Sequence, residues 1–175
     1  MKKFLLLATM GVVLAGPVYA QSIPEKTGIN STLGIAPKTE DFVKQVAMSD
    51  MFEIESGKLA ASKGAATKQF GSQMVADHTK TSGELKALLS SASVNVQLPM
   101  APDDAHKKKL DKLASLNGTE FDRQYAADQV EAHEDAVNLF DRYAKGGENA
   151  QLKAWAAKTV PALRHHLDMA KKLPR

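Results

Sequence analysis

The sequence has 175 residues, a formal net charge of +3 and no cysteine. Without cysteine the chain cannot form disulfides or use thiolate chemistry. Without residues 1–20, which carry two of the lysines, 21 basic residues face 20 acidic ones and the net charge falls to +1. This near balance gives no reason to expect a nucleic-acid partner.

Residues 1–20 have the pattern of a secretory signal peptide. Two lysines precede an apolar run at residues 4–16, and Ala20 is a small residue of the kind found before the cleavage site. About 13 apolar residues are fewer than the roughly 20 that a membrane-spanning helix needs. We therefore expect export to the periplasm and no transmembrane span in the mature chain, which would begin at Gln21. A retained membrane anchor is the alternative.

The mature chain divides into a short arm and one helical domain. Residues 21–38 hold two prolines and two glycines without an apolar period, which predicts a flexible N-terminal arm. We expect residues 39–175 to form a single all-α domain, because no stretch alternates apolar and polar residues long enough to predict a strand. The apolar spacing predicts five helices, at about 39–63, 65–92, 103–116, 119–145 and 149–173.

The lengths of the connections favour one topology. The first two helices are joined around Gly64 and the last two around Gly146, so each pair is expected to be an antiparallel hairpin. The long segment between the hairpins contains the shortest of the five helices, at about 103–116, and has room to run back along the domain. This pattern predicts a ferritin-like four-helix bundle, with two antiparallel hairpins joined by a long crossover that contains a short helix. Pro161 is expected to bend the last helix.

Each of the four long helices places one ionisable residue inside its apolar arc. At about 100° per residue, Glu53, His78, His133 and His166 fall on the apolar faces, whereas His165 points outward. Their distances from the hairpin turns put all four near the middle of the bundle. We therefore expect them to converge.

Several separated motifs resemble one bacterial family. The segments FEIESGKLA, FGSQMVADHTK, NGTEFDRQYAADQVEAH and VPALRHHL are similar to the family called domain of unknown function 4142, over about residues 38–173. That family groups exported proteins assigned to the ferritin-like superfamily and often labelled predicted outer-membrane proteins. The family's motif positions correspond here to Glu53, Asp77-His78, Phe121-Asp122, Tyr125, His133 and His166.

Two interpretations of the Glu/His set stay open. Glu53, His78, His133 and His166 could hold one transition-metal ion, Zn, Fe, Mn or Cu, with Asp77 as an outer partner. Alternatively, the set is a buried hydrogen-bond network in which Glu53 accepts from an imidazole.

A ferritin-type di-iron site is disfavoured. That site needs a Glu three residues before a His, and Val75, Val130 and Leu163 occupy those positions. No nucleophile lies beside a base and no cofactor fingerprint occurs, so the sequence favours a protein that is not an enzyme.

Outward-facing lysines suggest a different class of function. Lysine-rich faces on the first hairpin and the run Lys107-Lys108-Lys109 could make peripheral contact with anionic groups of the envelope, including the outer membrane. A solvated face without a ligand is the alternative. Trp155, Tyr125 and Tyr143 have the spacing of core residues. No motif identifies a substrate or an oligomeric state.

Overall fold

The computed structural model describes residues 22–174, so the predicted signal peptide, residues 1–20, lies outside the described residues. Within the described range the chain has seven helices and no strand, which confirms the predicted all-α class. The helices are α1 (Ile23–Lys26), α2 (Ile29–Leu33), α3 (Thr39–Lys63), α4 (Lys68–Ser91), α5 (Asp104–Ser115), α6 (Gly118–Gly146) and α7 (Ala150–Ala170).

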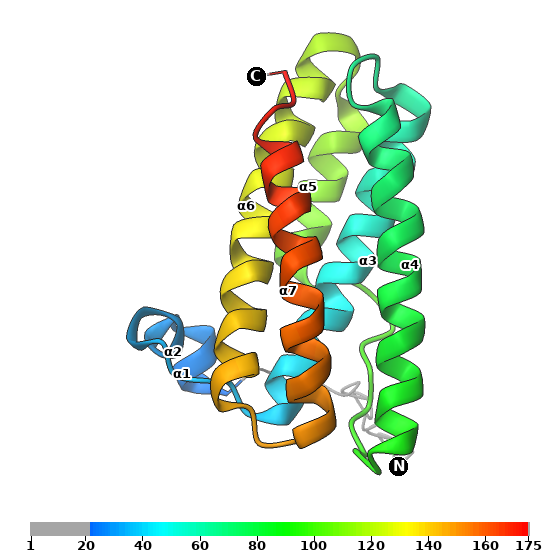
Figure 1. Cartoon of the computed structure of the whole chain (residues 1–175). Helices are drawn as coiled ribbons and strands as arrows, with labels where there is room; N and C mark the ends of the chain where they lie inside the picture. The colour runs from blue at the N-terminus through cyan, green and yellow to red at the C-terminus, as the bar shows by residue number, and fades with distance from the viewer. Residues whose placement is uncertain (1–21, 175) are drawn as a thin grey trace, which may run out of the picture.

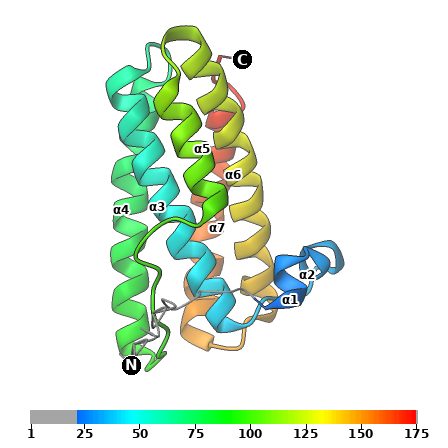
Figure 2. The same ribbon diagram turned by 180° about the vertical axis from the view of Figure 1, so that it is seen from behind.

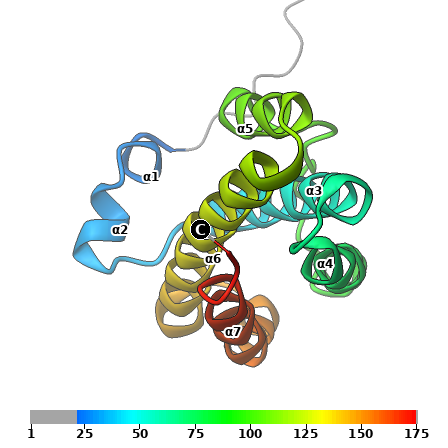
Figure 3. The same cartoon turned by 90° about the horizontal axis from the view of Figure 1, so that it is seen from above.

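The four long helices α3, α4, α6 and α7 lie side by side (Figure 1). The closest pairs are α3 with α4 and α6 with α7, and each pair is connected by a short turn. Seen from above, α6 also borders α3, and α7 borders α4 (Figure 3). The helix α5 lies outside these four, where it packs on both α3 and α6 (Figure 2).

The helix boundaries differ slightly from the predicted ones, and the differences have local causes. The second long helix begins at Lys68 rather than near residue 65. The carboxylate of Asp122, from α6, accepts hydrogen bonds from the Thr67 hydroxyl at 2.6 Å and from the Ala66 backbone N–H at 3.2 Å. A residue of a neighbouring helix therefore satisfies donors at the start of α4. The last helix continues through Pro161.

The segment predicted as a flexible arm contains α1 and α2, which lie beside α6 (Figure 1). It is fastened by an ion pair of 2.7 Å between Glu25 of α1 and Arg142 of α6. Arg142 also donates to the backbone carbonyl of Ile35 at 2.7 Å. Both charged side chains are buried. Burying either charge without its partner would be energetically costly, so the contact depends on both residues.

A polar layer divides the core into two apolar clusters. Each long helix contributes one residue to this layer, at position 53, 78, 133 or 166. On its helix, that residue lies between residues of one cluster and residues of the other. The predicted core positions Trp155, Tyr125 and Tyr143 are all buried. The first cluster centres on Phe42, Leu85, Phe140, Tyr143, Leu152 and Trp155, and the second on Phe70, Met74, Leu113, Phe121, Tyr125 and Ala170.

Candidate metal centre

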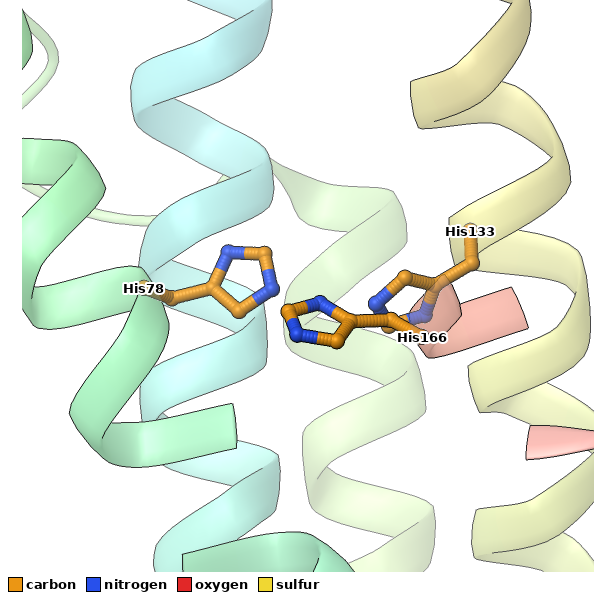
Figure 4. Close-up of side chains that lie close together, drawn as sticks. All are labelled: His78, His133 and His166. Atoms are coloured by element: carbon orange, nitrogen blue, oxygen red, sulfur yellow. The ribbon is translucent and has the colours of Figure 1, made fainter. Parts of the chain in front are cut away.

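Three histidines from three different helices point toward one another within the polar layer (Figure 4). His78 belongs to α4, His133 to α6 and His166 to α7. One ring nitrogen from each lies within 4.8 Å of the other two, and the side chains are only 4%, 1% and 6% exposed. The sequence spacing had predicted this convergence of the three imidazoles.

Each histidine also hydrogen-bonds through one ring nitrogen to an oxygen that can only accept. A nitrogen that faces such an acceptor carries the proton, so the opposite nitrogen of a neutral ring carries a lone pair. The three pairs are His78 Nδ1 with Asp50 Oδ1 at 2.8 Å, His133 Nδ1 with the Gln129 carbonyl at 2.9 Å, and His166 Nε2 with Asp77 Oδ2 at 3.1 Å.

The opposite nitrogens have no hydrogen-bond partner among the described residues. They are Nε2 of His78, Nε2 of His133 and Nδ1 of His166, and all three atoms are buried. Buried polar atoms in proteins are almost always paired, because an unpaired one costs about 1–3 kcal/mol. Three buried ring nitrogens without a donor, on rings that point toward one another (Figure 4), form an arrangement that could hold a metal ion.

Glu53 is buried in the same layer but outside the group of three close nitrogens. Its side chain is 1% exposed, and neither carboxylate oxygen has a hydrogen-bond partner in the described part of the chain. It is close enough for its negative charge to raise the pKa of both His78 and His133. The carboxylate of Glu53 is therefore close to two of the three imidazoles, those of His78 and His133.

Burial and charge give the three imidazoles different pKa values. Burial lowers the pKa of His78, but the hydrogen bond to Asp50 and the nearby negative charges outweigh it and raise that pKa. Burial lowers the pKa of His133. Burial, together with the positive charges on His133 and His78, lowers the pKa of His166 to about 4. At neutral pH, His133 and His166 are therefore lone-pair donors, and His78 is the site of any shared proton.

Two polar side chains complete the layer, and sequence analysis missed one of them. Asp50 is 2% exposed, and its second oxygen accepts a hydrogen bond of 2.9 Å from the hydroxyl of Ser82. Asp50 lies three residues before Glu53, so both acids are on one side of α3. This spacing is the sequence feature from which the position of Asp50 in the layer could have been predicted. Asp77, predicted as an outer partner, contacts His166 rather than its sequence neighbour His78.

The arrangement fits a metal cation of intermediate softness. Neutral imidazole nitrogens are ligands for Zn, Cu and Fe, and a buried carboxylate offsets part of the cation's charge. In metal proteins a ligating histidine usually donates its other N–H to a carboxylate or a backbone carbonyl. All three histidines here meet that condition.

Some of the lysines expected on binding faces are engaged within the chain, whereas Lys68, Lys86 and Lys108 have no ion pair among the described residues. Lys109 forms an ion pair of 2.8 Å with Glu131, and Lys107 one of 2.5 Å with Asp111. Lys63 donates to the backbone carbonyls of Ala114 and Leu116. None of the helices in residues 22–174 has the length and apolar character needed to cross a membrane.

Comparison with known proteins identifies a family. A family model described as Domain of unknown function (DUF4142) matches residues 24–173, which covers all seven helices except the first residue of α1. No curated protein and no solved structure matches the chain.

Proposed function

We propose that this chain, which belongs to the Domain of unknown function (DUF4142) family, binds one transition-metal ion in the periplasm. The ligands are His78, His133 and His166, and Glu53 is the adjacent carboxylate. The proposed role is metal binding, and any catalysis would depend on the metal, because the sequence offers no nucleophile with a neighbouring base.

One observation carries the proposal. Each of the three buried histidines offers one ring nitrogen within 4.8 Å of the other two. In each ring one nitrogen is bonded to an acceptor and the other is buried without a partner among the described residues. A proton can satisfy one of these lone pairs at a time, whereas a metal ion satisfies all three and also draws on the charge of Glu53. Metal binding would release any proton held by His78, because a ligating imidazole must be neutral.

The alternative is the buried hydrogen-bond network in which Glu53 accepts from an imidazole. The outer bonds of the histidines agree with a network, but Glu53 has no hydrogen-bond partner among the described residues. A network built around Glu53 would use it. The unpaired carboxylate and the unpaired nitrogens therefore favour the metal.

The donor set narrows the choice of metal. Three nitrogens and one carboxylate suit Zn, Cu or Fe better than Mn, which prefers oxygen ligands and binds more weakly to such sites. Three protein nitrogens with a fourth position for another ligand is an arrangement that zinc also adopts in catalytic sites. The metal identity is tested directly by elemental analysis.

The proposal also includes a ferritin-like four-helix bundle and export. The short turns after α3 and α6, and the crossover of residues 92–117 between α4 and α6, support two hairpins joined by a long connection. Export is supported by the signal pattern in residues 1–20. Fractionation of cells that express the full chain, with the mass of the mature protein, tests both cleavage before Gln21 and periplasmic location.

The decisive experiment measures metal in protein purified without an affinity tag or chelator. We expect close to one equivalent of a single metal in the wild type and almost none in His166→Leu. The chain supplies a matched control in His165→Leu, because His165 is the exposed neighbour of His166 and has no place in the cluster. Metal-free wild type that also fails to take up Zn, Cu, Fe or Mn would overturn the proposal in favour of the network.

A further inference from the structure

A cavity of about 350 Å³ reaches the candidate metal centre from the surface. It lies between α3 and α6, and residues of α1 and of α5 also line it. His78 and Asp50 border it, whereas His133, His166 and Glu53 do not. Pockets for small molecules usually have volumes of about 300–1,000 Å³, so the cavity is much larger than an ion needs.

The walls of the cavity combine polar and apolar side chains, and the apolar part distinguishes it from a simple path for ions. Side chains from α3, α6 and α7 line it, and the aromatic ones come from α3 and α6. The main apolar lining residues are Val46, Met48, Phe52, Leu139, Phe140 and Leu163. Such walls favour a ligand with an apolar body.

Carboxylates face the cavity without full compensation by cations. Asp50 borders it, and its hydrogen-bond partners among the described residues are an imidazole and a hydroxyl. Asp135 also lines the cavity, is exposed and has no ion pair in the described part of the chain.

Two of the basic side chains that line the cavity, Arg142 and Lys109, are bound to other groups of the chain. The guanidinium of Arg142 is held by Glu25, Ile35 and Asn138. The ammonium of Lys109 is paired with Glu131 at 2.8 Å. Lys26 also lines the cavity; it is exposed and has no ion pair among the described residues. The carboxylates of Asp50 and Asp135 remain as acceptors for a ligand that enters the cavity.

From this lining we propose that the cavity binds a small amphipathic amine. Its apolar body lies against the aromatic and aliphatic walls, and its ammonium group donates to Asp50 or Asp135. The proposal goes beyond metal binding, because it concerns a different ligand and is tested on metal-free protein. If no amine binds, the proposed metal binding is still tested separately, by the metal content of the wild type and of His166→Leu.

The test compares three probes that share one aromatic ring and differ in the charge of the head group: benzylamine, benzyl alcohol and benzoate. Binding is measured by ligand-observed NMR titration of the metal-free protein. We expect benzylamine to bind best and benzoate at least about tenfold more weakly, because the carboxylates attract the ammonium and repel the anion. Benzoate binding as tightly as benzylamine, or no binding of any probe, would overturn the proposal.

Substitutions in and outside the cavity test where benzylamine binds. Ser49→Phe should fill the cavity and reduce benzylamine binding at least about tenfold, since Ser49 is a half-buried lining residue. Ser62→Phe is the control on the same helix, because Ser62 is exposed and does not line the cavity. Asp135→Asn, at an exposed position that does not endanger the fold, should weaken benzylamine about threefold but leave benzyl alcohol unchanged. Benzylamine binding that is unaffected by both Ser49→Phe and Asp135→Asn would place it elsewhere and contradict the proposal.

Discussion

Asp50 of α3 accepts a hydrogen bond of 2.8 Å from Nδ1 of His78 on α4. Both side chains are buried, at 2% and 4% exposure. Because the carboxylate can only accept, it holds the proton of His78 on Nδ1 and directs the lone pair on Nε2 toward His133 and His166. A residue outside the cluster of histidines therefore orients one of them for its proposed role as a metal ligand.

Removing this acceptor should weaken metal binding. We expect Asp50→Leu to lower the metal affinity about 10- to 100-fold, the usual effect of losing an outer partner of a ligating histidine. Asp77→Leu should cost less, because the side chain of Asp77 is 43% exposed and its bond to His166 is longer, at 3.1 Å. Competition with a chromophoric chelator at fixed pH measures both affinities. Equal affinities for wild type and Asp50→Leu, in folded protein, would contradict the role given to Asp50.

Acid should destabilise the metal-free protein through His166. Its pKa is lowered from 6.5 to about 4 by burial and by the charges of His133 and His78, so the unfolded chain takes up this proton at a higher pH than the folded chain. The free energy of unfolding therefore falls as the pH drops from about 6.5 to about 4, by on the order of 2 kcal/mol from this group. His133 acts in the same direction, whereas His78, whose pKa is raised, acts in the opposite one.

Urea unfolding at pH 7 and at pH 4.5 checks this effect. The metal-free wild type and His165→Leu should lose more stability between the two pH values than His166→Leu does, because the variant lacks the group that titrates. An identical loss in all three proteins would mean that His166 is not held neutral in the folded state.

The sequence predicted those features that follow from helical periodicity. The apolar arcs located the long helices and placed the three histidines on their inner faces. Both predictions depend only on the helical period within a single helix. The predicted outward orientation of His165, next to the buried His166, is confirmed by its exposure. The all-α class followed from the same periodicity.

Contacts between distant segments were beyond this kind of reasoning. Asp122 belongs to α6, but it accepts hydrogen bonds from Thr67 and Ala66, which precede α4. The pairing of Asp50 with His78 likewise depends on how α3 is rotated against α4, which no local pattern specifies. The N-terminal arm has no apolar period from which its position could be predicted. It is held to α6 by the ion pair of Glu25 with Arg142 rather than by an apolar face.

Breaking the ion pair between Arg142 and Glu25 should release the arm. Arg142→Met leaves the carboxylate of Glu25 buried without its partner, which typically costs about 3–5 kcal/mol. Because α1 and α2 are short, we expect them to detach while the long helices stay folded. Hydrogen exchange should then rise in residues 22–35 but not in α4.

The double variant Arg142→Met with Glu25→Met is the control for this prediction. It removes both charges, so it should restore much of the protection that the single variant loses. Unchanged exchange in the single variant would show that other contacts hold the arm, such as the bond of 2.9 Å from the Ser22 backbone N–H to Asp41.

Two glycines allow α3 and α4 to approach closely, and a third one on α4 does not. A Cβ at Gly57 would lie 2.7 Å from the carbonyl oxygen of Gly71 and 2.9 Å from a methyl carbon of Val75, too close for either to stay in place. Gly57→Ala should therefore destabilise the protein by a few kcal/mol. Gly83 is exposed on α4 and a Cβ there meets nothing within 4 Å.

Gly83→Ala should consequently stabilise the protein by about 1 kcal/mol, the difference in helix propensity between the two residues. Thermal unfolding of both variants at one pH gives the comparison. If Gly57→Ala also stabilised the protein, the packing of α3 against α4 would have to be looser than the contacts around Gly57 and Gly71 require. Because Asp50 and His78 lie on these same two helices, a looser packing would also weaken the bond that directs Nε2 of His78 toward the cluster.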